Sequence, residues 1–262
     1  MLQIYYSIFA FLAGAVIGSF LDVMVSRTVS GKSFLMSRSE CDSCRKKLQI
    51  LDLVPLLSYL LLHGSCRYCK AKIPRRLFYM ELSTGLIFVI TYFATGAHLL
   101  QLILLLLIIS LLYAIFVADL RFGIIPDQFL IALGTVSLVF VASKVFILHE
   151  GFQLFLPHFL TGMVAFGFFM GIFLLTRGKG MGFGDVKFSF FVGFLLSFPL
   201  TIASFYIAFL TGAFISLILI IGGKKRLKGG TIPFGPFMAL GTVIALLFET
   251  QMLRVLQMFF GI

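Results

Sequence analysis

Charged residues are scarce in this chain, and their scarcity excludes a water-soluble globular protein. Of the 262 residues only 12% are charged, 60% are hydrophobic, and the mean hydropathy is +1.11. Such a composition describes a protein that crosses a membrane several times. A cleavable signal peptide is not evident either, because the first apolar segment lacks a positively charged start and a small-residue cleavage site.

Several common functional motifs are also missing. The GxxxxGK[ST] phosphate loop is absent, and no nucleic-acid-binding signature accompanies the net charge of +11. We therefore expect no nucleic-acid partner, since cytoplasmic loops and anionic membrane lipids account for the positive charge. No serine or cysteine nucleophile has a plausible base, because the four histidines are scattered along the chain at His63, His98, His149 and His158.

Long apolar segments predict an all-α polytopic membrane protein with about eight transmembrane helices. Each segment approaches the length needed to cross roughly 30 Å of hydrocarbon. They fall near residues 2–25, 82–97, 99–118, 124–148, 158–176, 186–199, 200–222 and 233–251. Close helix packing is expected at four small residues, namely Gly162, Gly167, Gly171 and Gly193.

The distribution of lysine and arginine predicts the orientation, because cytoplasmic loops retain these residues. Eleven of the 21 lie between Arg27 and Arg76, eight more lie in or beside later loops, and two, Lys144 and Arg254, fall on the other side. With eight spans the N-terminus lies outside. The expected cytoplasmic loops are then 27–81, 119–123, 177–185 and 223–232.

Two aspartates are predicted to meet at the cytoplasmic membrane face. Asp119 ends an apolar run, and Asp185 closes the sequence Gly182-Phe183-Gly184-Asp185 before another. Carboxylates at such a boundary are costly and are therefore functional candidates. Two adjacent carboxylates share a proton, so one can activate water while the other polarises a peptide carbonyl. This is aspartyl-protease chemistry without a covalent intermediate.

Other interpretations of the two aspartates stay open. Asp119 can pair with Arg121, and Asp185 can serve as a negative charge at a helix N-terminus. Both can also form a proton or cation relay in a transporter, which is the main alternative function. Asp127 follows Pro126 at the start of a predicted helix, where it has a structural role or replaces Asp119 as the partner. Gly182 and Gly184 lack side chains that would block access to Asp185.

All four cysteines fall into two CxxC pairs, and this spacing predicts a tetrahedral zinc site. The pairs are Cys41/Cys44 and Cys66/Cys69. Disulfides and a redox pair are the alternatives, but the expected location is the reducing cytoplasm. Four thiolates would complete the coordination, so the zinc would be structural and would fold a small cytoplasmic domain after the first helix.

Several motifs follow one another along nearly the whole chain. They begin with Gly18-Ser19-Phe20-Leu21, the two CxxC pairs and Val54-Pro55-Leu56-Leu57-Ser58-Tyr59-Leu60. They continue with Glu81-Leu82-Ser83-Thr84-Gly85, Asp119-Leu120-Arg121, Ile125-Pro126-Asp127, Gly180-Met181-Gly182-Phe183-Gly184-Asp185-Val186-Lys187 and Ile232-Pro233-Phe234-Gly235-Pro236-Phe237. Together these motifs resemble those of the bacterial type IV prepilin peptidases, which are GxGD-type intramembrane aspartyl proteases.

The resemblance implies a bifunctional enzyme of the bacterial cytoplasmic membrane. It would remove the leader of type IV prepilins or of the pseudopilins of type II secretion, with Asp119 and Asp185 as the catalytic pair. It would then methylate the new N-terminus with S-adenosylmethionine, for which the sequence itself carries no fingerprint. The implied parts are a first helix (1–26), a zinc-binding, methyltransferase-associated loop (27–81) and a peptidase domain (82–262).

Some positions bear on these two activities. Lys187 and Asp127, with Gly182 and Gly184, are expected to support the peptidase site. Glu81 is a candidate for the methyl-transfer site, or else a negative charge at a helix N-terminus. Asp22, where many relatives have asparagine, and Asp42 in the first CxxC pair depart from the family pattern, and both lie in the methyltransferase part.

Overall fold

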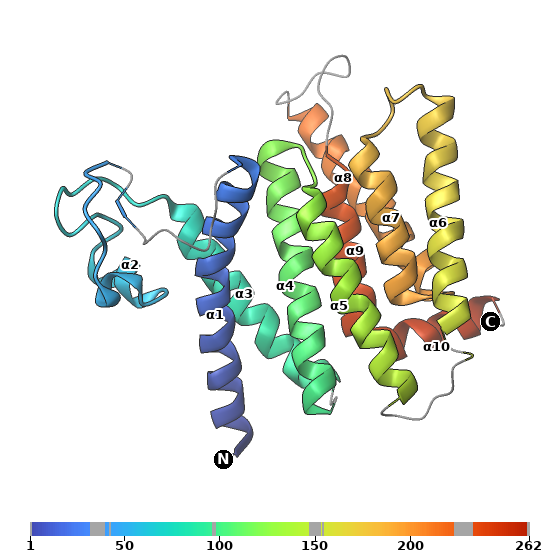
Figure 1. Ribbon diagram of the computed structural model, residues 1–262, viewed down its shortest axis with the longest axis horizontal. Helices are drawn as coiled ribbons and strands as arrows, with labels where there is room; N and C mark the ends of the chain where they lie inside the picture. The colour runs from blue at the N-terminus through green and yellow to red at the C-terminus, as the bar shows by residue number, and fades with distance from the viewer. Residues whose placement is uncertain are drawn as a thin grey trace. The chain divides into compact units, whose positions relative to one another are not determined.

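The computed structural model describes residues 2–31, 40–41, 43–95, 98–146, 153, 155–222 and 233–260. Features named above that fall outside this range are Asp42, His149, Ile232 and the expected loop 223–232. The chain divides into two compact units, Met1–Ala97 and His98–Ile262. Regular structure in the described residues is helical, apart from two isolated β-bridges. The all-helical prediction is therefore confirmed (Figure 1).

In the first unit, two long helices pack against each other and carry a loop domain between them. These helices are α1 (Leu2–Val29) and α3 (Arg75–Thr95), and the loop contains the short helices η1 (Ile50–Leu53) and α2 (Leu57–Leu61). Glycines let the long helices approach closely. A Cβ at Gly14 would lie 2.7 Å from the carbonyl oxygen of Thr84, so a larger residue there would push the helices apart.

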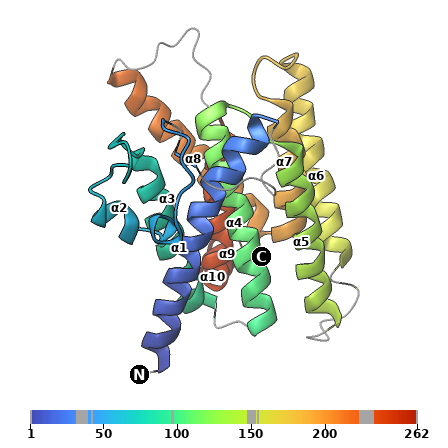
Figure 2. The same ribbon diagram turned by 60° about the vertical axis from the view of Figure 1, so that its left-hand side comes forward.

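The second unit is a helical bundle built around one short helix. Its elements are α4 (Leu99–Phe122), α5 (Asp127–Phe146), α6 (Phe155–Leu175), α7 (Phe183–Leu196), α8 (Leu200–Ile221), α9 (Gly235–Leu247) and α10 (Glu249–Phe260). Ten of the 13 residues of α9 are buried, and this helix packs against α4, α7 and α8. Figure 2 shows α9 behind α4, within the bundle.

Six helices of the described residues are long and apolar enough to cross a bilayer: α1, α3, α4, α5, α6 and α8. A seventh span results only if α9 and α10 count together, and this pair is bent by 90°. Helix α7 has 14 residues, which reach about 21 Å at 1.5 Å per residue against roughly 30 Å of hydrocarbon. Each of the eight expected segments forms a helix, but the number of spans is six or seven.

Close helix packing is confirmed at two of the four glycines that suggested it. A Cβ at Gly193 of α7 would come within 2.8 Å of the Cα of Gly162 on α6, so these helices touch through their backbones. By contrast, a Cβ at Gly167 or Gly171 would meet nothing within 4 Å, and packing does not require glycine there. A third close contact joins α8 and α9, where a Cβ at Gly241 would lie 2.3 Å from the Ser204 carbonyl oxygen.

Candidate functional site

The four cysteines converge in the loop domain of the first unit. Their sulfur atoms all lie within 4.8 Å of one another, and none of the four forms a disulfide. The sulfurs of Cys41 and Cys69 are 3.8 Å apart, which is about the separation that tetrahedral geometry requires at Zn–S distances near 2.3 Å. This cluster can bind a metal ion.

The two cysteine pairs lie in turns of the same construction. In each turn, the N–H of the first cysteine donates to the carbonyl five residues on, and the N–H four residues on donates back to that cysteine's carbonyl. The residue after the second cysteine has positive φ, and an antiparallel bridge closes each turn. The first-cysteine N–H bonds are Cys41 to Lys46 and Cys66 to Ala71, and the residues with positive φ are Arg45 and Lys70. The bridges join Glu40 to Lys47 and Ser65 to Lys72.

This turn geometry directs backbone N–H groups at sulfur. The N–H groups of Cys69 and Tyr68 donate to the Cys66 sulfur and lower the pKa of this thiol to about 6. Metals bind the thiolate rather than the thiol. The turn therefore favours the metal-binding thiolate of Cys66. At Cys69, a hydrogen bond from the Ala71 backbone lowers the pKa, but burial and the other three thiols outweigh it and raise the pKa to about 11.

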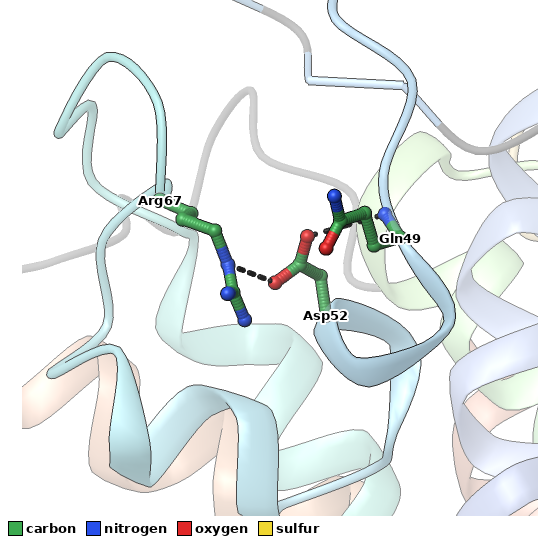
Figure 3. Close-up of polar contacts among 3 residues, drawn as sticks. All are labelled: Gln49, Asp52 and Arg67. Carbon is green, nitrogen blue, oxygen red and sulfur yellow. Dashed lines mark hydrogen bonds and ion pairs between the residues drawn. The ribbon is translucent and has the colours of Figure 1, made fainter.

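Asp52 ties the segment between the two cysteine pairs to the second pair. Its carboxylate accepts hydrogen bonds from the Gln49 backbone N–H at 3.1 Å and from Nε of Arg67 at 2.8 Å (Figure 3). The Asp52 side chain is only 2% exposed, so the cation of Arg67 offsets a buried negative charge. Sequence reasoning overlooked this pair, although Arg67 lies inside the second CxxC.

Glu81 lies near the start of α3, on the side that faces the loop domain. It is 7% exposed, and its Oε2 accepts a hydrogen bond from the Leu56 N–H at 2.7 Å. A Cβ at Gly18 of α1 would come within 3.0 Å of the Glu81 Cα, so this glycine allows α1 to pack there. Asp22 of α1 forms an ion pair with Arg76 of α3 at 3.3 Å.

In the second unit, Asp119 and Asp185 come together from two helices. Asp119 lies in the last turn of α4, which ends at Gly123 with φ of +67°. Asp185 lies in the first turn of α7 and is followed by the buried face of that helix. The two side chains are 4% and 7% exposed, and their carboxylates interact electrostatically. Among the described residues, Asp119 Oδ2 and Asp185 Oδ1 are buried without hydrogen-bond partners.

Gly235, at the start of α9, completes this centre. A Cβ there would lie 2.5 Å from Asp119 Oδ2, and the Gly235 backbone N–H interacts with both carboxylates. Ile125 packs beneath, because a Cβ at Gly184 or at Gly235 would come within 3.2 Å or 2.9 Å of its side chain. Sequence reasoning treated Gly235 only as part of a motif near the last helix. Its position between Phe234 and Pro236, at a helix start, was the available signal.

The expected supporting residues lie beside the two aspartates, each with its own contact. Gly182 leaves space next to Asp185, since a Cβ there would lie at an ordinary 3.6 Å from Oδ2. Gly184 is needed instead for the contact with Ile125. Asp127 begins α5 and forms an ion pair with Lys187 of α7 at 2.5 Å, which joins the two helices next to Asp185.

These features define a multi-pass membrane protein with a buried carboxylate pair and a separate four-cysteine cluster. Residues 12–95 match the bacterial peptidase A24 N-terminal domain, and residues 105–217 match the type IV leader peptidase family. The chain belongs to the prepilin leader peptidase/N-methyltransferase family, as the resemblance of its motifs predicts.

Several relatives carry the name prepilin leader peptidase/N-methyltransferase, and three of them show the extent of the similarity. The protein of Bacillus subtilis is 30% identical over 238 residues, covering 91% of this chain and 92% of the relative. The protein of Pseudomonas aeruginosa is 29% identical over 286 residues, with 95% and 93% coverage. The protein of Aeromonas hydrophila is 29% identical over 276 residues, with 96% and 93% coverage. No solved structure matches the chain.

Proposed function

We propose that this protein is a membrane-embedded aspartyl endopeptidase that removes the leader peptide of type IV prepilins or pseudopilins, and that it then methylates the new N-terminus. One observation carries the peptidase assignment. Two buried carboxylates from distant segments, Asp119 and Asp185, meet at the N-terminus of α9, where each keeps an oxygen without a partner. Family membership and the names of the relatives support the same function.

In the proposed reaction, water adds to the scissile carbonyl between the two carboxylates. The ionised aspartate takes a proton from the water, and the protonated one donates a hydrogen bond to the carbonyl oxygen. Collapse of the resulting tetrahedral adduct breaks the C–N bond, and an aspartic acid protonates the leaving amine. The Gly235 N–H lies beside both carboxylates and helps to fix their orientation. Gly182 leaves room for the substrate backbone next to Asp185.

We place this site at the cytoplasmic face of the bacterial cytoplasmic membrane. In the second unit, the site end of the bundle carries Arg121, Arg177, Lys179 and Lys187. The opposite ends of the described helices carry Lys144 and Arg254. This distribution supports a cytoplasmic site by the positive-inside rule. The N-terminus would then lie outside, and membrane lipid would surround the apolar helices.

For the first unit we propose a structural zinc ion bound by Cys41, Cys44, Cys66 and Cys69. The sulfur spacing and the thiolate-favouring turn at Cys66 support zinc. The loop 27–81 that holds this site, with the helix 1–26, is assigned to methyl transfer, and residues 82–262 to the peptidase. Glu81 belongs to the methyl-transfer site. S-adenosylmethionine supplies the methyl group.

Mass spectrometry of a purified prepilin tests the peptidase assignment directly. The substrate is incubated in detergent with wild type, Asp119→Asn or Asp185→Asn, and its N-terminus is sequenced. Wild type should remove the leader, and each variant should lose roughly 10²–10⁴-fold in rate because a proton-transfer group is gone. Leader removal by either folded variant at the wild-type rate contradicts the catalytic pair. Proton flux without cleavage by wild type would instead favour the transporter relay.

A further inference from the structure

The loop domain of the first unit contains a cavity that borders the cysteine cluster and extends beyond it to α3. The cavity runs from both cysteine turns, where Cys41 and Cys66 line it, to the start of α3. Its lining includes Ser19 of α1, Asp52 of η1, Tyr59 of α2, and Arg67, Leu77 and Glu81. Apolar and polar groups thus line one partly open cavity, as in sites for amphipathic small molecules.

Within this cavity, Glu81 is a buried acid that forms no ion pair with any residue the structure describes. The Leu56 N–H occupies its Oε2, and among the described residues its other oxygen has no hydrogen-bond partner. Arg67 is one of two cations that line the cavity, and its Nε donates to the Asp52 carboxylate. The other, Lys72, is exposed to solvent and forms no ion pair with Glu81 in the described structure. A buried carboxylate in this state favours a positively charged ligand.

A strained turn holds Glu81 in position. Leu56 has φ of 62° and ψ of −50°, and the Leu57 N–H donates to the Pro55 carbonyl oxygen at 2.6 Å. These values describe a γ-turn with positive φ, which is rare and unfavourable for a leucine. The turn directs the Leu56 N–H at the Glu81 carboxylate. Local strain is thus tolerated where it fixes the direction of one buried acid beside the cavity.

We propose that this cavity binds the methyl donor and that the Glu81 carboxylate lies against its sulfonium charge. The proposal rests on the methyltransferase part of the proposed function and names the residue that recognises the donor. In the transfer, the amine lone pair of the new N-terminus forms a bond to the methyl carbon. The carbon–sulfur bond breaks with both electrons going to sulfur, and the amine then releases a proton to water.

The charge on the donor explains why an acid suits this position. S-adenosylmethionine is a cation at sulfur, whereas the product, S-adenosylhomocysteine, is a neutral thioether at the same atom. A carboxylate at the sulfonium therefore holds the donor and releases the product. The other cation in this reaction is the α-ammonium group of the cleaved pilin. Because this ammonium group and the sulfonium have the same charge, binding measurements must distinguish the pilin from the methyl donor.

Calorimetric titration of the purified full-length protein tests this proposal without measuring turnover. S-adenosylmethionine, S-adenosylhomocysteine and sinefungin, a cationic analogue with an amine-bearing carbon in place of sulfur, are each titrated. Wild type should bind both cations at least about tenfold more tightly than the neutral product, a difference of about 1.4 kcal/mol. Glu81→Gln should remove this preference, because it should lower the affinity for the two cations and leave the affinity for S-adenosylhomocysteine unchanged. Glu249→Gln, an exposed acid in the second unit, is the matched control.

Several results would overturn the proposal. Equal affinities of wild type for the three ligands would contradict it. This test uses wild type alone, so it remains valid if Glu81→Gln does not fold. An unchanged cation preference in a folded, zinc-loaded Glu81→Gln would also do so. If Glu81→Gln weakens only a pilin peptide with a free N-terminal amine, and not its acetylated form or S-adenosylmethionine, the sulfonium assignment is wrong. Leader cleavage by wild type in the same preparation shows separately whether the peptidase function stands.

Discussion

The cysteine cluster draws all of its ligands from one short segment, Cys41–Cys69, whereas the aspartate centre brings together positions 119, 185 and 235. The first is held by turns, one ion pair and four sulfurs in a region with few buried apolar residues. The second lies between the long helix α4 and two short helices, α7 and α9, most of whose residues are buried. In one, four sulfurs at a metal-binding spacing stand where a hydrophobic core is small, and in the other apolar packing fixes charged groups.

This contrast predicts that metal removal has the largest effect, and that the effect is confined to one unit. Structural zinc contributes about 10–16 kcal/mol to the folding of small peptides that bind it. Chelation, or Cys41→Ser with Cys69→Ser, should unfold residues 43–74 and abolish methylation. Leader cleavage should persist, because Asp119 and Asp185 belong to the other unit. Hydrogen exchange with a parallel cleavage assay measures both, and retained protection of 43–74 in metal-free protein would contradict the comparison.

Gly235→Ala should have the next largest effect, now on the aspartate centre. The added methyl would lie 2.5 Å from Asp119 Oδ2, and a displacement of about 1 Å can lower a rate by about 10²-fold. Cleavage kinetics measure this loss, while S-adenosylmethionine binding should stay unchanged. Gly171→Ala is the control, because a Cβ there meets nothing within 4 Å. Wild-type cleavage by Gly235→Ala would show that the centre tolerates movement of Asp119.

Asp52→Asn should weaken the loop domain by a smaller amount. The substitution removes the charge that pairs with Arg67 and weakens an acceptor that is 2% exposed. The expected cost is about 1–3 kcal/mol. Hydrogen exchange in the loop should accelerate accordingly, with the zinc content retained. Loss of zinc together with the exchange protection would mean that Asp52 supports the cysteine cluster itself.

Lys187→Gln should have the smallest effect. Its ion pair with Asp127 joins α5 and α7 next to Asp185, but the two side chains are 34% and 63% exposed. Pairs of this kind contribute less than about 1 kcal/mol and weaken with salt. Thermal unfolding in low and high salt checks this, with Lys179→Gln as the control. A large loss of cleavage without a loss of stability would instead assign Lys187 to substrate binding.

The sequence predicted sites whose residues are close together in the chain better than features that depend on contacts between distant residues. The CxxC spacing indicated the cysteine cluster directly, because its ligands are close in sequence. Asp119 and Asp185 were found through their matching position at helix ends, a signal that membrane topology supplies. Gly235 was overlooked because its role is the space that it leaves beside Asp119, which no local pattern records. The γ-turn at Leu56 was likewise hidden, since the strain depends on the Glu81 carboxylate that accepts its N–H.

The predicted number of transmembrane helices shows the same limit of sequence-based prediction. All eight apolar segments form helices, but hydropathy does not record where a helix ends within the bundle. Helix α7 stops after 14 residues, and α9 bends by 90° into α10. Asp22 adds a further example, because Arg76, which forms an ion pair with it, lies on the neighbouring helix.

The repeated cysteine turns also bear on the order of events during synthesis of the protein. Cys41 and Cys44 leave the ribosome first and offer a metal ion only two thiolates, half of the set. Cys66 and Cys69 follow, and α3 begins soon afterwards at Arg75. Because chains fold from the N-terminus as they are made, the proposed zinc ion would find its full set of ligands only as α3 emerges. On that proposal, the supply of zinc during translation would set when α1 and α3 can pack around the loop domain.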